Sequence, residues 1–325
     1  MDRRNFMIGT AASATALVAG PGQAEDAYPS RTITIVNPYP PGGVNELATR
    51  PLVAALETVI KKPVILETKA GAAGQVGAQV VATAKPDGYT LLCHNTALAG
   101  FPQVDRLFGR TPKFTNDSFI PIARLVADPC VLVANDQQPY KTLKDFVDDA
   151  KKRPNGIVFS TAGFYAATHL PMVLFMKSAG LQLRHLPTSG GGPSLTALLG
   201  NNSNVSILGV SGTLAQIRAG KLRPLALMGG KRSKALPDVP TMKELGYNTE
   251  YYLWVGIFAP KGTPPNIIDS LRKSIDAAAH TDQYKANLAN IGLDLEYMDA
   301  PEFAKFWAID SKNVVSAVES IGKAS

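Results

Sequence analysis

A turn that could bind an anion lies near the start of the chain. The segment Pro40–Asn45 (PPGGVN) follows an apolar run at Thr32–Val36 and precedes a helical pattern at Glu46–Ile60. Free backbone N–H groups and the positive end of the helix dipole meet at such a helix start. Glycine lets a ligand approach the backbone closely, because no Cβ atom intervenes. The turn predicts an anion site, although a plain strand-to-helix turn could have the same residues.

Four further turns rich in glycine or hydroxyl side chains follow other predicted strands, at Ala70–Gly77, His94–Ala97, Ser160–His169 and Ser189–Ser194. Ligands of open α/β sheets bind at this carboxyl edge of the strands. The glycines of Ala70–Gly77 are spaced G-x-x-G-x-x-G, whereas dinucleotide loops need G-x-G-x-x-G. We therefore interpret that segment as a glycine-lined helix start and expect no cofactor.

Patterns typical of catalysis are scarce. The sequence has no G-x-S-x-G elbow, no H-E-x-x-H pair and no Walker A loop. Ser160 and His169 could form a nucleophile and its base, but no residue is marked as the acid that would orient the histidine. His94, His185 and His280 do not complete a zinc-site spacing with His169. We expect a binding protein, not an enzyme, and no metal; an exported serine hydrolase using Ser160 and His169 is the alternative.

Strand-like runs alternate with helical patterns, which predicts an α/β fold with parallel sheets. The segment Phe101–Asn116 interrupts the alternation, and we expect a long loop there. The expected strands are Thr32–Val36, Val64–Glu67, Thr90–Cys93, Cys130–Ala134, Val158–Thr161, Leu183–His185, Val205–Leu208, Leu222–Leu227 and Trp254–Ala259, and the expected helices include Glu46–Ile60, Gln75–Thr83, Leu143–Lys152, Leu170–Ser178, Ser194–Leu199, Leu214–Ala219, Pro265–His280, Gln283–Ile291 and Pro301–Ser320.

The order of these elements predicts two lobes. We place lobe 1 at residues 28–127 and 253–325, and lobe 2 at residues 128–252. The chain then crosses between the lobes twice, through the strands at Cys130–Ala134 and Trp254–Ala259. Two crossings make a hinge, and a hinge between two α/β lobes makes a cleft that can close.

The N-terminus predicts export. Arg3 and Arg4 are followed by Phe6 and by a mildly apolar run at Ile8–Gly20, which is the twin-arginine pattern. Small residues before the expected cleavage after Ala24 give a signal peptide at residues 1–24; a Sec signal is the alternative. No later stretch reaches the roughly 18–20 apolar residues that span a bilayer. We therefore expect the chain in the periplasm.

The charge is mildly basic and dispersed. Lys and Arg number 33 against 26 Asp and Glu, a net charge of +7. Nucleic-acid binding would need a basic stripe with aromatic residues, and the sequence has none; the charge favours anionic small molecules instead. Cys93 and Cys130 lie in apolar runs. We expect two buried free thiols, although an oxidising compartment would permit a disulfide.

Seven motifs resemble those of the Bug-type receptors, the periplasmic receptors of tripartite tricarboxylate transporters. They follow the family's order along essentially the whole chain after the predicted signal peptide. They are Tyr28–Val36 (YPSRTITIV), Pro40–Asn45 (PPGGVN), Ala70–Gly77 (AGAAGQVG), Pro86–Leu91 (PDGYTL), Gly220–Ala226 (GKLRPLA), Leu236–Thr241 (LPDVPT) and Trp254–Pro260 (WVGIFAP).

The resemblance implies a two-lobed Venus-flytrap fold, close to the type II periplasmic-binding-protein class, with no catalysis and no cofactor. It also implies a carboxylate ligand and transient contact with the membrane subunits of a transporter; we expect a monomer. A ligand-presenting subunit of a sensor system is a second alternative. Carried over by motif, the ligand-binding residues are Pro41, Gly42, Gly43, Asn45 and Thr96 in lobe 1, and Ser160, Gly163, Thr168, His169, Gly190, Gly191 and Gly192 in lobe 2.

The chain departs from the family pattern in the loop after Ser160. Tyr165 and Ala166 stand where the family has a second glycine and a hydroxyl residue. We therefore add Phe164 and Tyr165 to the site, as an aromatic wall that would favour a larger or ring-bearing carboxylate. The alternative is that both rings turn away and pack between the lobes.

Overall fold

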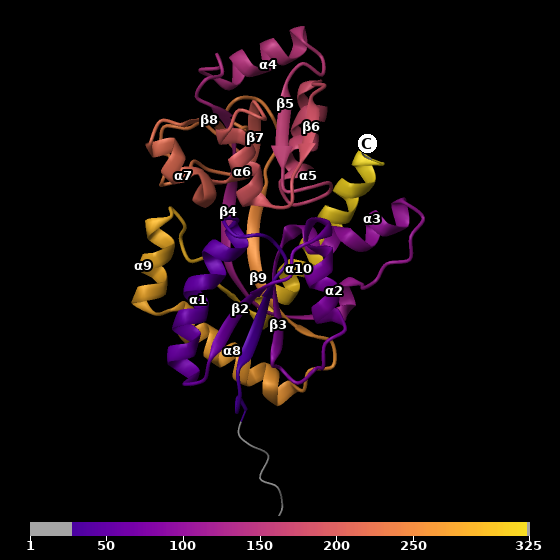
Figure 1. Ribbon diagram of the computed structural model, residues 1–325, viewed down its shortest axis with the longest axis vertical. Coiled ribbons are helices and arrows are strands. Elements are labelled where there is room, and N and C mark those ends of the chain that lie inside the picture. Colours follow the sequence, from indigo (N-terminus) through magenta and orange to yellow (C-terminus); the bar gives the residue numbers. More distant parts are fainter. Residues whose placement is uncertain (1–27, 324–325) are drawn as a thin grey trace, which may run out of the picture.

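Two long strands join the two lobes of the protein. The computed structural model describes residues 28–323, and Figure 1 shows β4 and β9 running between an upper and a lower group of helices and strands. β4 (Phe119–Asn135) pairs with β9 (Tyr252–Pro260) as far as Pro129. From Cys130 onward it pairs with β7 (Val205–Gly209) and β8 (Leu222–Leu227). The change of partner lies beside our predicted lobe boundaries, which stay a prediction.

Within residues 28–323 the strands form one mixed sheet in the order β2-β1-β3-β9-β4-β7-β5-β6, with β8 and β10 also paired to β4. The β2-β1-β3 and β7-β5-β6 pairings are parallel, as expected, whereas β4 and β9 are antiparallel to their neighbours. The remaining strands are β1 (Ile33–Asn37), β2 (Val64–Thr68), β3 (Thr90–Asn95), β5 (Val158–Thr161), β6 (Arg184–Pro187) and β10 (Met298–Asp299).

Helices cover both parts of this sheet (Figure 1). The first of them, α1, follows the Pro-Gly turn and ends where Lys61 adopts a left-handed conformation with φ 55°. The helices are α1 (Val44–Ile60), α2 (Gln75–Ala82), α3 (Phe101–Leu107), α4 (Leu143–Lys152), α5 (His169–Ala179), α6 (Gly191–Leu199), α7 (Val210–Arg218), α8 (Pro265–Ala279), α9 (Asp282–Asn290) and α10 (Ala300–Ile321), with short 3₁₀ segments at Ala72–Gly74, Thr96–Gly100 and Asn116–Ser118.

Two expectations about the elements were wrong in extent. The strand predicted at Cys130–Ala134 is only the last part of β4, which begins at Phe119 and gains its length by pairing with β9. The segment Phe101–Asn116 is not a long loop throughout, because Phe101–Leu107 forms α3. Phe101 and Val104 are buried there, Val104 against Val314 and Val318 of α10. A helix seven residues long has too few turns for a clear sequence period, and tertiary packing supplies the stability that the local pattern does not predict.

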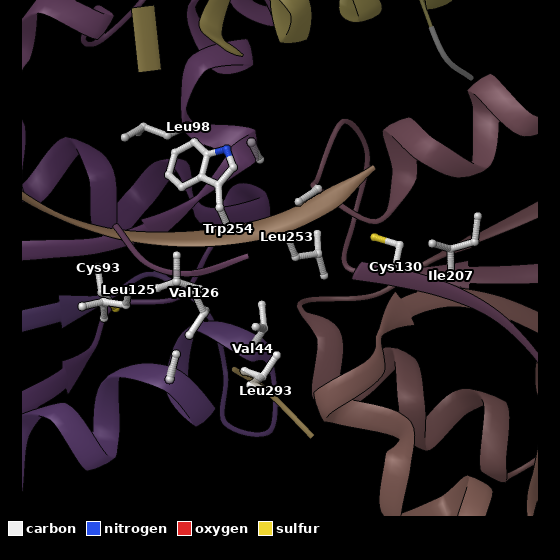
Figure 2. Close-up of a cluster of buried hydrophobic side chains, with 14 of the residues drawn as sticks. Val44, Cys93, Leu98, Leu125, Val126, Cys130, Ile207, Leu253, Trp254 and Leu293 are labelled. Atoms are coloured by element: carbon white, nitrogen blue, oxygen red, sulfur yellow. The ribbon is translucent and has the colours of Figure 1, made fainter. Parts of the chain in front are cut away.

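A hydrophobic core continues through the hinge. Figure 2 shows Leu125, Val126 and Trp254 on the lobe 1 side and Cys130 and Ile207 on the lobe 2 side of the same cluster. Cys93 and Cys130 are both buried and both free, as expected. No helix among residues 28–323 is long and apolar enough to cross a membrane. The predicted signal peptide, residues 1–24, lies outside the described residues.

Candidate functional site

A small cavity lies where the carboxyl ends of the strands of the two lobes meet. We call it the inner cavity; its volume is about 40 Å³. That is space for roughly two or three water molecules, far below the 300–1,000 Å³ of typical ligand pockets. It is lined by Tyr39, Pro40, Gly42, Gly43, Val44, Asn45, Glu46 and Asn95 from lobe 1, by Ala162, Ala167, Thr168, Gly191, Leu195, Leu208, Gly209 and Gly212 from lobe 2, and by Leu253 of β9.

Glycines make this cavity small because they let the two backbones touch. A Cβ atom on Gly192 would collide with the carbonyl oxygen of Pro41, and one on Gly190 would lie 2.9 Å from Cδ of Pro40. A Cβ atom on Gly42, whose φ is 90°, would lie 3.3 Å from Cα of Gly192. The lobes are thus closed on one another. An organic acid of several carbons can enter only if they first separate.

Helix starts from both lobes converge on the inner cavity. Gly43, Thr168 and Gly209 line it and are the N-cap residues of α1, α5 and α7, and Gly191 begins α6. None of these helices has a hydrogen bond from the side chain of its own N-cap residue. Converging N-termini give a field that favours an anion. The start of α7 already faces an acid of the chain itself, because the Ser211 N–H donates to the Asp128 carboxyl group (3.2 Å), so α7 offers less of its positive end to a ligand.

The side-chain charge of the inner cavity is acidic. Its described lining includes no lysine, arginine or histidine, and Glu46 is its charged residue. The Glu46 carboxylate accepts hydrogen bonds from the Gly42 N–H (2.7 Å) and from Nε of Arg50 (2.9 Å). The amide of Gly42, which we expected to be free for a ligand, therefore already has an acidic partner within the chain.

Buried side-chain amides hold the lobe 1 wall in place. Asn95 donates to Asn45 (2.8 Å) and accepts from the Tyr39 hydroxyl (3.2 Å), and Asn45 also donates to the Cys93 carbonyl oxygen (3.3 Å). Burial raises the pKa of the Tyr39 phenol far above its usual value, so this hydroxyl stays protonated. The network fixes the amide side chains that face the cavity.

A second, larger cavity lies beside the first along the cleft. We call it the outer groove; its volume is about 530 Å³. Gly163 of lobe 2 closely approaches Ala73 of lobe 1 there, and a Cβ atom on Gly163 would lie 3.2 Å from that of Ala73. The outer groove is lined by Gly71, Ala72, Ala73, Gln75, Val104, Phe108 and Arg110 from lobe 1, and by Gly163, Phe164, Tyr165, Pro187, Thr188 and Ser189 from lobe 2.

The two aromatic residues that we predicted as a wall both line the outer groove but differ in exposure. Phe164 is 38% exposed and lines the outer groove, not the inner cavity. Tyr165 is buried, and its hydroxyl donates to the Gly322 carbonyl oxygen at 2.8 Å, just beyond α10. The ring of Tyr165 packs between the lobes, against Val104 and α10, whereas our alternative placed both rings there and Phe164 stays exposed.

Two histidines lie beneath Phe164. The rings of His169 and His185 have their centroids 4.7 Å apart, and Phe164 meets the His185 ring edge-on at 4.7 Å. Burial lowers the pKa of His169 to about 3, with a further contribution from His185, and burial lowers that of His185 to about 4. Both rings are neutral near pH 7 and support the loop as a packed pair.

Comparison with known proteins identifies the family. The model of the tripartite tricarboxylate transporter family receptor matches residues 49–322. The chain is 34% identical to protein BugT of Bordetella pertussis over 267 residues, which cover 82% of this chain and 81% of BugT. The chain belongs to this receptor family.

Solved structures of family members agree with the two-lobed fold. The periplasmic binding protein BugD is 28% identical, with a TM-score of 0.85, and the alignment covers 91% of this chain and 99% of BugD. MatC from Rhodopseudomonas palustris, solved with bound malate, is 26% identical with a TM-score of 0.83, covering 91% of this chain and all of MatC. The family and these neighbours are solute-binding receptors, which confirms our expectation of a non-enzyme.

The hydrolase alternative fails on geometry as well. In this receptor the Ser160 hydroxyl is fully buried, donates to the Ser194 carbonyl oxygen (3.2 Å) and accepts from the Ser203 hydroxyl (2.9 Å). His169 accepts instead from the N–H of Tyr165 (3.2 Å). Ser160 therefore belongs to a buried hydroxyl cluster that joins β5 to α6, and it lies outside the lining of both cavities.

The sequence-predicted site residues thus fall into separate places. Thr96 lies toward the hinge, where its hydroxyl donates to the Tyr252 carbonyl oxygen (3.0 Å). Gly209 and Gly212 were missed, although Gly209 directly follows a predicted strand and so had the same signal as the other turns. The inner cavity unites Gly42, Gly43, Asn45, Thr168 and Gly191; Pro41, Gly190 and Gly192 form the contact between the lobes; Gly163, Phe164 and Tyr165 line the outer groove; and Ser160, His169 and Thr96 lie apart.

Proposed function

We propose that this receptor captures an organic carboxylate in the inner cavity and delivers it to the membrane subunits of a tripartite transporter. The observation that carries the proposal is the convergence of the starts of α1, α5, α6 and α7 on a cavity lined without a cationic side chain. Such a site binds a carboxylate through backbone amides and neutral donors such as Asn45 and Thr168. Bound malate in MatC supports this ligand class.

Closure would couple binding to delivery. Open lobes admit the ligand, and contacts from both lobes then shift the equilibrium toward the closed form. The inner cavity as it stands, with Gly42 and Gly192 touching, is too small for malate, so the lobes would close on the ligand while staying slightly farther apart than here, and would still shield it from solvent. A membrane partner would recognise the closed form and release the ligand by opening it. We further propose that the protein acts in the periplasm as a monomer.

Titration of the purified protein with malate and other short diacids tests the proposal. Saturating ligand, at 100 times its dissociation constant, should stabilise the protein by about 2.7 kcal/mol in a thermal-shift assay. Gly43→Val should weaken binding at least tenfold, about 1.4 kcal/mol, since a Cβ atom there lies 3.8 Å from the Gly191 nitrogen and a branched side chain would fill the gap.

A matched control accompanies this titration. Ala54→Val also introduces a valine, on the exposed side of α1 and outside the lining of the inner cavity, so it should bind normally. Absence of binding across mono-, di- and tricarboxylates, or unchanged affinity in Gly43→Val, would contradict the proposal.

Export by the twin-arginine route is tested separately. Replacing both Arg3 and Arg4 by lysine should retain the precursor in the cytoplasm, and normal maturation would point to the Sec route.

A further inference from the structure

The outer groove has the properties of a ligand site, yet the proposed function does not use it. At about 530 Å³ it falls within the range of small-molecule pockets, whereas the inner cavity does not. Its walls come from both lobes: Ala73 and Phe108 from lobe 1, and Gly163 and Phe164 from lobe 2. The groove in this form therefore exists only while the lobes are closed.

Exposed rings and a cation meet in this groove. Phe108 and Phe164 are 37% and 38% exposed, and they are among the few large apolar side chains of the described chain left open to solvent. The guanidinium of Arg110 lies over the Phe108 ring, 5.1 Å from its centroid, while its Nε donates to Asp105 (2.9 Å). The ammonium of Lys323 lies 5.9 Å from the same ring centroid. The groove thus combines apolar ring surface with a guanidinium that is ion-paired to Asp105 and with the nearby ammonium of Lys323.

The backbone of the groove is strained. Ala72, Ala73 and Tyr165 have φ values of 45°, 56° and 57°, a left-handed conformation that non-glycine residues seldom adopt. All three line the groove, from opposite lobes. Strained backbone of this kind gathers at ligand sites, where the surrounding structure holds it in place. This observation is independent of the rings and the charge, and it points to the same place.

We propose that the outer groove is a second binding site, which takes a ring-bearing carboxylate. The ring of the ligand packs on Phe108 and Phe164, and its carboxylate faces Arg110. An aliphatic acid of the same size would lack the ring contacts, and a neutral aromatic compound would lack the charge contact. Because both lobes line the groove, an occupant favours the closed form and should strengthen binding in the inner cavity.

Calorimetric titration with benzoate, alone and in the presence of malate, tests the inference. Phe164→Leu removes a ring but keeps an apolar side chain, and Arg110→Gln removes the charge; each should weaken benzoate at least tenfold and leave malate within about twofold. Arg31→Gln is the matched control, because Arg31 also pairs with an aspartate, Asp87, and lies over a tyrosine ring. Its benzoate affinity should not change.

The outcomes separate this inference from the proposed function. Failure of benzoate to bind at about 10 mM overturns it. So do equal benzoate affinities in the native protein and both groove variants, and so does displacement of benzoate by malate. Malate binding that persists in any of these cases leaves the proposed function standing. Conversely, benzoate binding that depends on Phe164 and Arg110, in a protein that binds no short diacid, supports the groove and counts against the proposed function.

Discussion

The inner cavity and the outer groove lie side by side in one cleft but are lined by different kinds of residue. Backbone glycines and neutral amides surround the inner cavity, where Gly42 and Gly192 touch. Aromatic rings and Arg110 surround the outer groove, which is more than ten times larger in volume. The two share a dependence on lobe closure, since both lobes line each of them.

The difference separates selection by charge from selection by shape. Helix N-termini attract a carboxylate of any parent molecule, because every helix start presents the same N–H groups. Aromatic rings and the loops around them select for the shape of the rest of the ligand, because apolar contact depends on how well the two surfaces fit. In this receptor the two tasks fall to neighbouring surfaces of the same loops, such as Ala162–Thr168.

The largest effect is expected where the lobes touch. Gly192→Ala places a methyl group against the Pro41 carbonyl oxygen and should prevent full closure. The fold should survive, since alanine suits the first turn of α6. Binding to both sites should fall more than tenfold by calorimetry. Gly220→Ala, whose Cβ atom would meet nothing within 4 Å, lies outside both cavities and should bind as the native protein does. If Gly192→Ala loses only one of the two ligands, the sites do not share closure.

The stability of the protein should fall as the pH drops from about 6.5 toward 4. Burial lowers the pKa of His94 and His185 to about 4 and that of His169 to about 3, so the unfolded chain takes up protons before the folded one does. Asp128, whose pKa burial raises to about 7, opposes this trend, because it holds a proton in the folded state that the unfolded chain releases.

Chemical denaturation at several pH values measures this trend. His185→Asn should reduce the rise of unfolding free energy with pH, because it removes one of the groups beneath Phe164. His280, which is exposed, provides the control as His280→Asn. An unchanged pH dependence in His185→Asn would show that the groove side of lobe 2 contributes nothing to it.

A smaller effect, on stability, is expected at Tyr165, whose ring supports the outer groove. Tyr165→Phe removes the hydrogen bond to the Gly322 carbonyl oxygen and should cost about 1 kcal/mol of unfolding free energy. Malate affinity should stay the same, because Tyr165 lines the groove and not the inner cavity. A marked loss of malate binding without a loss of stability would mean that Tyr165 contributes to the inner cavity.

The smallest effect should distinguish the inner cavity by its charge. Glu46→Gln keeps an acceptor for the Gly42 N–H but removes the negative charge from the lining. Dianionic malate should bind about threefold more tightly, an effect of about 0.6 kcal/mol that weakens with salt. Glu57→Gln, on the exposed side of α1, is the control. Tighter binding of benzoate instead would mean that benzoate occupies the inner cavity.

Much of the fold could be predicted because its signals are local. The strand at Val158–Thr161 and the helix at Leu143–Lys152 have the bounds expected from their patterns. Helix α3 was missed, because its stability comes from packing on α10 and not from its own seven residues. β9 was predicted to within two residues, whereas only Cys130–Ala134 of β4 was, and the antiparallel direction of both strands follows from their pairing with each other across the lobes.

The sequence by itself determined the family, the glycine turns and the helix starts that favour an anion, because glycine, proline and apolar spacing act within a few residues. Only the tertiary structure decided which turns meet. In the tertiary structure Gly209 and Gly43 line the same cavity, and the Gly42 N–H donates to Glu46. The Tyr165 hydroxyl donates to Gly322, and Phe164 lines the outer groove instead of the inner cavity. These outcomes depend on contacts between residues that are distant in sequence or on the direction of a side chain, and no local pattern encodes them.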